Sequence, residues 1–248
     1  MKILFVPNWN GHLHISDKDD DSVRRIFYEL KTEYDKIIVE TIKNDINKTQ
    51  ELIKKEYVKH LSTDFVLTLN GDHSNTYPLV EEFSKYSEDF KLVIFDAHPD
   101  VEEDSGVVSH EDYLRFLIKN KIIKPENIYL FGIRMFSRLE LEFLESTGVN
   151  YFTIVDILRD KDKINKILES LSGPIYLSVD IDVLDPDDAP GTYYSEHCGL
   201  YIEELENFIL LIKDKITGAD INEYFSEKDI DDKTKNNTIR IMNIFLNQ

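Results

Sequence analysis

The sequence predicts an α/β fold, in which helices cover both faces of a mostly parallel sheet of about eight strands in a three-layer α/β/α arrangement. Short runs rich in β-branched and aromatic residues recur, and each is followed by a stretch with helical periodicity. Two of these runs, Leu92–Asp96 and Ile175–Asp182, are nearly continuously apolar, as central parallel strands buried on both faces are. No linker, repeat or low-complexity tract interrupts the chain, so residues 1–248 are expected to form a single domain.

The expected elements alternate strictly along the chain, strand first. The strands are Lys2–Val6, Lys36–Thr41, Asp64–Leu69, Lys91–Asp96, Asn127–Phe131, Tyr151–Ile154, Pro174–Asp180 and Lys215–Ile221. The helices are Ser22–Glu33, Lys48–His60, Thr76–Tyr86, Glu111–Asn120, Ser137–Ser146, Lys161–Leu171, Glu203–Ile212 and Thr234–Leu246. This alternation implies crossover connections and a parallel sheet. A closed eight-stranded barrel has the same alternation and is the main alternative.

The charge balance restricts the partners. The chain has 29 basic and 48 acidic residues, a net charge of −19. Nucleic acid and anionic membranes are therefore not expected as partners, because both require a basic surface. A cationic substrate, in contrast, would be attracted.

The chain has features of a cytoplasmic protein. Cys198 is the only cysteine, so no intramolecular disulfide can form. The first segment, MKILFVPNWN, is too short in its apolar run for a signal peptide and is interpreted as a strand. No stretch approaches the roughly 18–20 apolar residues of a membrane span.

Metal-ligand residues collect where three of the expected strands end. The third strand runs into Asn70-Gly71-Asp72-His73-Ser74, the fourth into Asp96-Ala97-His98-Pro99-Asp100, and the seventh into Asp180-Ile181-Asp182. Alternate residues of an extended backbone point to one side, so Asp96, His98 and Asp100 are expected to converge, as are Asp180 and Asp182.

These groups are more than one cation needs. Four carboxylates and two imidazoles packed together would repel strongly without metal, whereas two cations bridged by shared carboxylates remove the difficulty. Oxygen-rich ligation with a little imidazole suits Mn²⁺ better than a sulfur-rich zinc site. The sequence therefore predicts a site for two divalent cations.

The same segments resemble the ureohydrolase family, the manganese enzymes that include arginase, agmatinase and formimidoylglutamase. The family motifs are GGDHS, DAHxD, SxDxDxxDPxxxPGTGTPxxGG and a late DxxE. This chain has NGDHS at 70–74, DAHPD at 96–100, SVDIDVLDPDDAPGT at 178–192 and DINE at 220–223. The resemblance runs in order from about residue 65, whereas the first 60 residues match only as generic α/β sequence. It implies a single arginase-like catalytic domain with an eight-stranded parallel sheet, and argues against a closed barrel.

The resemblance also implies roles for individual residues. One Mn²⁺ would be held by His73, Asp96, Asp100 and Asp180, and the other by Asp96, His98, Asp180 and Asp182. His110, in Ser109-His110-Glu111-Asp112, matches the family's proton-shuttling histidine, and a pKa near neutrality suits that task. Asp100 is expected to accept a hydrogen bond from the attacking hydroxide. Glu223 matches the glutamate that pairs with the substrate's guanidinium.

The expected reaction is hydrolysis of a guanidino or amidino C–N bond, with two Mn²⁺ per chain lowering the pKa of a shared water. Agmatine-like or modified guanidines are favoured as substrates, then arginyl peptides, then free arginine. The alternatives are a formimino-amino-acid hydrolase, a single-zinc deacylase of the same broad fold and a non-catalytic metal-binding regulatory protein. The family also implies a homo-oligomer.

Three departures from the family pattern concern the substrate. Tyr193-Tyr194-Ser195-Glu196-His197-Cys198 replaces a segment of small residues, Asn70 replaces a glycine, and Tyr224-Phe225 stands where the family has proline after DxxE. The segment Asn8–Asp21 could line the mouth of the site, but its histidines, His12 and His14, are expected to be plain surface residues.

Overall fold

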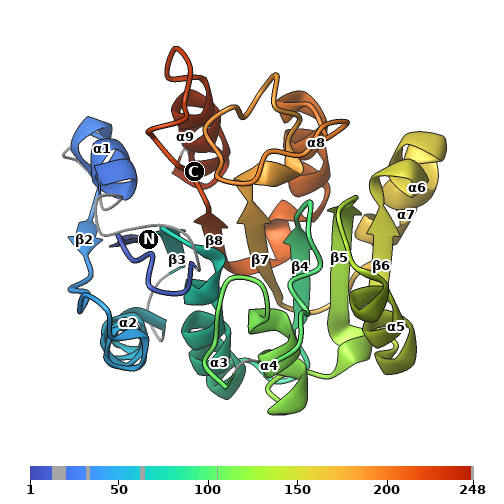
Figure 1. Cartoon of the computed structure of the whole chain (residues 1–248), viewed down its shortest axis with the longest axis horizontal. Coiled ribbons are helices and arrows are strands. Elements are labelled where there is room, and N and C mark those ends of the chain that lie inside the picture. Colours follow the sequence, from blue (N-terminus) through green and yellow to red (C-terminus); the bar gives the residue numbers. More distant parts are fainter. Residues whose placement is uncertain (13–20, 32–33, 62–64, 105, 247–248) are drawn as a thin grey trace.

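The computed structural model describes residues 1–12, 21–31, 34–61, 65–104 and 106–246 (Figure 1). The strands are β1 (Lys2–Val6), β2 (Lys36–Ile38), β3 (Val66–Asn70), β4 (Lys91–Phe95), β5 (Ile128–Ile133), β6 (Asn150–Thr153), β7 (Ile175–Asp180) and β8 (Ile216–Asn222). The α-helices are α1 (Asp21–Glu29), α2 (Ile46–Leu61), α3 (Thr76–Tyr86), α4 (Tyr113–Lys119), α5 (Arg138–Thr147), α6 (Ile154–Arg159), α7 (Lys161–Ser170), α8 (Ile202–Ile212) and α9 (Lys233–Leu246). Short 3₁₀ turns are η1 (His73–Asn75), η2 (Pro125–Asn127), η3 (Ile181–Val183) and η4 (Lys213–Lys215).

The eight strands found among the described residues belong to one parallel sheet. Their order is β2-β1-β3-β8-β7-β4-β5-β6, and every neighbouring pair is parallel. The sheet is open, with β2 and β6 at its edges, so the predicted parallel sheet is confirmed and the closed-barrel alternative is wrong.

Two hydrophobic cores lie on the two faces of this sheet. Along β4, Val93 and Phe95 enter one core while Leu92 and Ile94 enter the other, as the alternation of side chains along a strand requires. Helices α1, α6, α7, α8 and α9 cover the first face, and α2, α3, α4 and α5 cover the second (Figure 1). The expected three layers are therefore present.

The largest difference from the expected elements is at the edge strand β6. The strand was expected to include Ile154, but this residue begins a helix, α6, that the sequence did not predict. Thr153 starts the helix with a capping box, in which its hydroxyl accepts the N–H of Asp156 and the Asp156 carboxylate accepts the N–H of Thr153. Because the helix follows the strand without a loop, the apolar residues of the two elements form one continuous run.

Other boundaries differ by a few residues. The strand expected over Lys36–Thr41 ends at Ile38, and the helix expected over Ser22–Glu33 ends at Glu29. Thr32 and Glu33 of that expected helix, and Asp64 of the strand expected over Asp64–Leu69, lie outside the described residues. Within the described parts of the chain, no helix has both the length and the apolar run that a bilayer crossing needs.

Candidate metal centre

The candidate metal ligands and Glu223 lie at the carboxyl ends of four strands that are neighbours in the sheet. His73 follows β3, Asp96 follows β4, Asp180 ends β7, and Glu223 follows β8. Because the order in this part of the sheet is β3-β8-β7-β4, parallel strands bring all four ends to one edge. Ligand sites of open α/β sheets lie at this edge.

The ligands converge through bends and a 3₁₀ turn, not through the extended backbone that we expected. Strand β4 already ends at Phe95, the chain bends at Ala97 and His98, and Asp100 has a φ of 51°, in the left-handed region. Asp180 is the last residue of β7, and its carboxylate accepts the N–H of Asp182 (2.8 Å) inside the turn η3. The expectation of alternation along a strand was therefore wrong, although the side chains meet.

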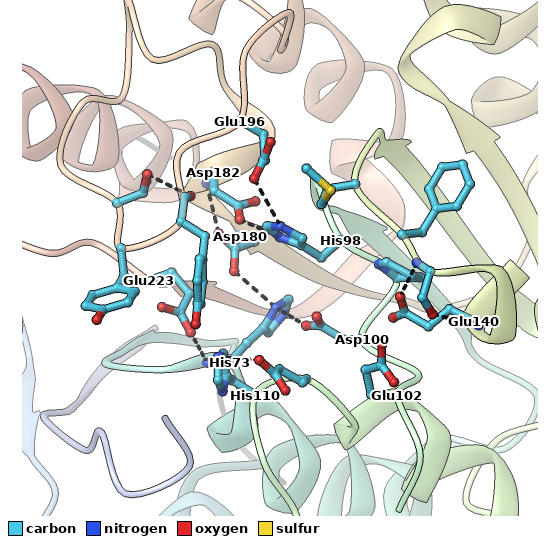
Figure 2. A pocket seen from close by; sticks show the side chains of 18 residues that line it. His73, His98, Asp100, Glu102, His110, Glu140, Asp180, Asp182, Glu196 and Glu223 are labelled. Carbon is cyan, nitrogen blue, oxygen red and sulfur yellow. Dashed lines mark hydrogen bonds and ion pairs between the residues drawn. The ribbon is translucent and has the colours of Figure 1, made fainter. Parts of the chain in front are cut away.

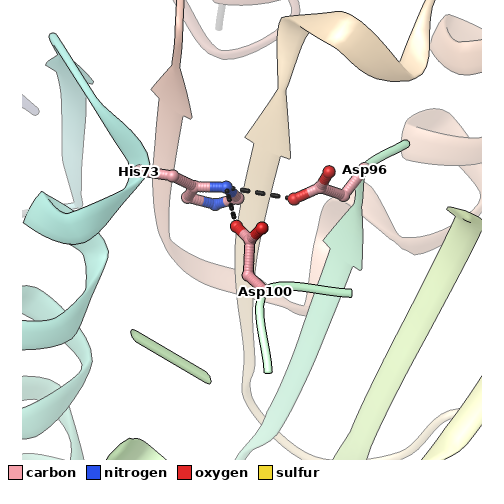
Figure 3. A group of neighbouring side chains, drawn as sticks. All are labelled: His73, Asp96 and Asp100. Atoms are coloured by element: carbon pink, nitrogen blue, oxygen red, sulfur yellow. Dashed lines mark ion pairs between the residues drawn. The ribbon is translucent and has the colours of Figure 1, made fainter. Parts of the chain in front are cut away.

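One group of ligands surrounds the imidazole of His73 (Figure 3). Its Nδ1 lies 3.0 Å from Asp96 Oδ2, 3.1 Å from Asp100 Oδ2 and 3.2 Å from Asp180 Oδ2. His73 is almost fully buried, as is Asp96. Neither His73 Nδ1 nor Asp96 Oδ2 has a hydrogen-bond partner among the described residues. Buried polar atoms seldom lack a partner, so these two fit a cation bound between them.

A second group surrounds His98 and shares Asp96 with the first. His98 Nδ1 lies 2.9 Å from Asp182 Oδ2 and 3.8 Å from Asp96 Oδ1. Asp96 therefore turns one oxygen toward each histidine. The first group consists of His73, Asp96 and Asp100, and the second of Asp96, His98 and Asp182. Within each group the potential ligand atoms lie within 4.8 Å of one another, which is close enough to hold one ion.

The carboxylates of the site have unusual pKa values. Burial, followed by the charges of neighbouring aspartates, raises the pKa of Asp96 to about 7, and burial also raises the pKa of Asp100 to about 7. Burial would raise the pKa of Asp182 as well, but the charge and hydrogen bond of His98 outweigh it and lower that pKa to about 2. Closely spaced carboxylates away from water hold protons unless cations neutralise them, so the donor set fits divalent metal.

Glu223 lies beside this group. It is buried, has a φ of 67°, and its Oε1 accepts the backbone N–H of His73 (2.9 Å). Burial, together with the charges of Asp180 and Asp72, raises its pKa well above the usual range. Glu223 and five of the six predicted metal ligands line one cavity of about 470 Å³ (Figure 2). The sixth, Asp96, does not line the cavity itself but contacts His73, which does.

His110 lines the same cavity and is held by the N-terminal segment. Its backbone N–H and its ring Nδ1 both lie near the carbonyl oxygen of Gly11, at 3.2 Å and 3.1 Å. A carbonyl oxygen can only accept, so Nδ1 carries the hydrogen. Position 11 also packs closely against Ser74, because a Cβ there would lie 2.1 Å from Ser74 Oγ, and this favours glycine.

The ring of His12 stacks on that of His110, with the centroids 4.1 Å apart and the planes at 15°. His12 is 6% exposed, so the expectation of a surface histidine is wrong for this residue. His14 lies outside the described residues.

Of the residues that depart from the family pattern, Tyr193, Tyr194 and Glu196 line the cavity, and Phe225 lies next to it in contact with Tyr193. Phe225 packs edge-on against Trp9 and against Tyr193, with centroid distances of 5.6 and 5.7 Å. The ring of Tyr194 is parallel to that of His110 at 6.1 Å. Glu196 Oε1 lies 3.9 Å from His98 Nε2. These residues, together with Trp9 and with His12, whose ring contacts Tyr193, are called the rim. The rim consists of Trp9, His12, Tyr193, Tyr194, Glu196 and Phe225.

Asn70, which replaces a glycine of the family pattern, is the last residue of β3 and is fully buried. Its side-chain amide donates to Asn222 Oδ1 (2.8 Å), so the residue that replaces the family's glycine links β3 to β8.

Arg134, which the sequence analysis did not single out, fastens the rim to the ligands. Its guanidinium donates to the carbonyl oxygens of Asp182 (2.7 Å) and Leu184 (3.1 Å) around η3, and to those of Glu196 (2.9 Å) and His197 (3.1 Å) in the loop above. The planar guanidinium with its five donors suits such a set of acceptors. The sequence does offer one indication that Arg134 has a role in the site, because it is a charged residue directly after the apolar strand β5.

Two further acids that the sequence analysis missed, Glu102 and Glu140, line the cavity. Figure 2 shows them on the side of the view opposite Glu223, with His73 and Asp180 between. Glu140 also caps α5, where its carboxylate accepts the N–H of Ser137 (2.8 Å). The spacing of Ser137 and Glu140 is that of a capping box. In the sequence it indicates where a helix begins, but it does not indicate that Glu140 lines a cavity.

The chain is similar to known proteins over most of its length. The family model described as "Arginase family" matches residues 10–246. An agmatinase from Bacillus cereus is 34% identical over 188 residues, which cover 73% of this chain and 63% of that protein, so the match spans less than two thirds of the relative's length.

Solved structures agree in fold. The arginase from Bacillus subtilis superposes with a TM-score of 0.87 at 22% identity, covering 100% of this chain and 98% of that one. The formimidoylglutamase from Bacillus subtilis gives a TM-score of 0.87 at 23% identity and covers 97% and 84%. At these identities the likeness concerns the fold. The match of the family model over residues 10–246 is the finding that assigns the chain, which belongs to the arginase family.

Proposed function

We propose that this chain is a binuclear, manganese-dependent hydrolase that releases urea from an agmatine-like or otherwise modified guanidine. Water adds to the guanidinium carbon, the C–N bond to the amine breaks, and urea and a protonated amine result. The observation that carries the proposal is the pair of histidine–aspartate groups that share Asp96 and open into one cavity with Glu223. Membership of the arginase family supports it.

The ligand sets proposed for the two ions are those that the resemblance to the family implies, and contacts among these residues support them. His73, Asp96, Asp100 and Asp180 would hold one Mn²⁺, and Asp96, His98, Asp180 and Asp182 the other. The contact of Asp96 with both histidines supports its bridging role. When bound, the ions supply Lewis acidity and lower the pKa of water from about 15.7 towards neutrality.

Glu223 would orient the guanidinium. One of its oxygens accepts the His73 N–H, which fixes the carboxylate beside the ligands. A carboxylate has about four lone-pair sites, so it can accept guanidinium N–H groups at the same time. Charge-assisted hydrogen bonds of this kind are roughly twice as strong as neutral ones. The guanidinium carbon would then be held next to the metal ligands.

His110 and Asp100 would handle the protons. Because His110 Nδ1 donates to the Gly11 carbonyl, the neutral ring has its basic lone pair on Nε2. That atom can take up a proton and deliver it to the departing amine. Asp100 lies beside His73 in the same cavity, where its carboxylate can accept the hydrogen of the attacking water.

The charge of the cavity supports a cationic substrate without a carboxylate. Glu223 lies on one side and Glu102 and Glu140 on the other, and the described lining includes neither lysine nor arginine. A substrate with a guanidinium at one end and an ammonium at the other fits this distribution. An arginine side chain within a peptide also lacks a free carboxylate at that position. Free arginine would bring its α-carboxylate towards these acids.

Three other functions are less well supported. A formimino-glutamate has two carboxylates, which this acidic lining would repel. A single-zinc deacylase would not need the second ligand group around His98. A purely regulatory metal-binding protein would not need His110 and Glu223 in the same cavity.

We also propose that the sheet and its helices act as one catalytic domain, since α1 and α9, from opposite ends of the chain, pack in the same core. The homo-oligomeric assembly and the cytoplasmic location stay predictions.

The proposal is tested by removing metal with a chelator, restoring Mn²⁺, and measuring urea release. The screen includes guanidino amines, guanidino acids, arginyl peptides and a formimino amino acid. We expect activity that is lost on chelation, returns with two Mn²⁺ per chain, and is highest for guanidino amines. Activity indifferent to both steps, or none with any amidino compound, would contradict the proposal. One metal ion per chain would favour the deacylase instead.

A further inference from the structure

Beneath the proposed metal site lies a chain of buried polar groups that the proposed mechanism does not use. Ser178 is on β7, and Asp220 and Asn222 are on the neighbouring strand β8. Together with Tyr176 they are fully buried. Buried polar groups are costly unless each is hydrogen-bonded, so the arrangement of donors and acceptors can be followed completely.

Asp220 is the common acceptor of this network. Its Oδ1 accepts the hydroxyl of Ser178 (2.6 Å) and the amide of Asn222 (2.7 Å), and its Oδ2 accepts the hydroxyl of Tyr176 (2.7 Å). The Asn222 amide is itself oriented, because its Oδ1 accepts the Asn70 amide (2.8 Å). The carboxylate of Asp220 is therefore fixed from three sides.

The network ends at His73, where it determines which ring nitrogen carries a hydrogen. Ser178 has a single hydroxyl hydrogen and donates it to Asp220, so its Oγ can only accept from His73 Nε2, which lies 2.9 Å away. His73 Nε2 therefore carries a hydrogen, and the lone pair of the neutral ring is on Nδ1. That atom is the one that faces Asp96 and Asp100 (Figure 3).

We propose that Asp220, acting through Ser178, is a positioning residue that holds His73 in the tautomer and ring orientation that present Nδ1 to a divalent cation. Metal-bound histidines usually donate their second ring N–H to a carboxylate or a carbonyl, and such partners typically change metal affinity by about 10–100-fold. Here a serine hydroxyl is inserted between the imidazole and the carboxylate. The inference rests on the metal site of the proposed function but not on its substrate.

Two variants test the inference. Ser178→Ala removes the hydroxyl that connects Asp220 to His73, and Asp220→Asn replaces the carboxylate with an amide of nearly the same shape. An amide at position 220 can donate to Ser178 Oγ, and the hydroxyl can then donate to His73 Nε2 and place the ring hydrogen on Nδ1. Tyr176→Phe is the matched control, because it removes a hydrogen bond to the same carboxylate and leaves the path from Asp220 to His73 intact.

Mn²⁺ affinity is measured in the absence of substrate from the EPR signal of free Mn²⁺, and coordinated histidine nitrogens are counted by pulsed EPR of the bound ion. We expect Ser178→Ala and Asp220→Asn to bind one of the two ions about 10–100-fold more weakly and to lose one nitrogen coupling. Tyr176→Phe should stay within about 3-fold of the wild type. Wild-type affinity and both nitrogen couplings in the first two variants would overturn the inference, as would an equal loss in the control.

Thermal unfolding of the metal-free variants separates this effect from a loss of folding. If Asp220→Asn does not fold, Ser178→Ala, which only removes an oxygen, carries the test. Because no reading depends on turnover, an inactive protein that shows the expected Mn²⁺ changes would contradict the proposed function and leave this inference standing.

Discussion

The floor and the rim of the cavity are built differently. The floor, consisting of His73, Asp96, Asp100, Asp180 and Asp182, comes from strand ends and the turns that follow them, and it is buried. The rim comes from loops, in which Tyr194 and Glu196 are partly exposed. The floor residues stand in segments that match the family motifs, whereas Tyr193, Tyr194, Glu196 and Phe225 stand where the chain departs from them. Under the proposed function, the metal chemistry would therefore be common to the family, and the choice of substrate would depend on the rim of this chain.

Arg134 connects the two regions through backbone carbonyls only. It binds those of Asp182 in the floor and of Glu196 and His197 in the loop above. Since these hydrogen bonds go to backbone oxygens, the side chains of the loop residues can differ without loss of the connection. This explains how a rim with two tyrosines and a glutamate is compatible with an intact set of ligands.

The largest effect should come from His110, which lines the cavity, stacks on His12 of the rim and would transfer a proton in the proposed reaction. His110→Asn removes the Nε2 that would exchange a proton, so we expect turnover to fall by roughly 10²–10⁴-fold. Because His110 is not in either ligand group, the metal content should not change. Steady-state urea release and metal analysis of the same preparation check this.

Asp182→Asn in the floor provides the contrast. It weakens the group around His98, so we expect loss of bound metal together with activity. If both variants lost metal equally, the distinction between the two regions and the role given to His110 would be wrong.

The second-largest effect should be the pH dependence of the free energy of unfolding of the metal-free protein, which the carboxylates of the floor cause. The folded protein raises the pKa of Asp96 and Asp100 to about 7, so between about pH 4 and pH 7 it binds protons that the unfolded chain has released. The free energy of unfolding should therefore fall as pH rises through this range. Mn²⁺, which binds the deprotonated ligands, should reverse the trend.

Urea unfolding of chelator-treated and Mn²⁺-loaded protein at pH 5 and pH 8 measures this response. A metal-free protein that is more stable at pH 8 than at pH 5 would show that the carboxylates are not crowded as described. Asp182, whose pKa is lowered to about 2, titrates below this pH range. It therefore does not change the expected direction of the pH dependence.

The smallest effect should come from the rim acid. The Glu196 side chain is 24% exposed, and exposed charges contribute about 1 kcal/mol or less. Glu196→Gln should therefore raise KM for a guanidino amine by no more than about 5-fold, with kcat and metal content unchanged. Glu145→Gln, the same change at an exposed position on α5 away from the cavity, is the control. A large fall in kcat would place Glu196 with the floor.

Much of the fold could be predicted because the central strands are continuous apolar runs. The runs around Val93 and Leu177 are buried on both faces, and the alternation of strands and helices specified the parallel sheet. Helix α6 was missed because Ile154 continues the apolar run of an edge strand. Its start depends on the cap formed by Thr153 and Asp156, which is a local signal of two polar residues.

The residues of the site could be predicted as a set but not in their geometry. Spacing grouped Asp96, His98 and Asp100, and it grouped Asp180 with Asp182. The first group, however, depends on the positive φ of Asp100 and the second on the turn after Asp180, and an alternation pattern shows neither. Partners distant in sequence were missed, since a motif shows only neighbours. The contact between Gly11 and His110 joins residues 99 positions apart, and that between Ser178 and Asp220 joins residues 42 apart.

The central claim is that six side chains, which come from the carboxyl ends of the three strands β3, β4 and β7, hold two ions side by side. A crystal structure of protein grown with ample Mn²⁺, with anomalous diffraction measured at the manganese edge, tests it most directly. We expect two anomalous peaks, one beside His73 and Asp100 and one beside His98 and Asp182, with Asp96 and Asp180 between them. Absence of both peaks, or the same side chains turned away from one another, would contradict the account.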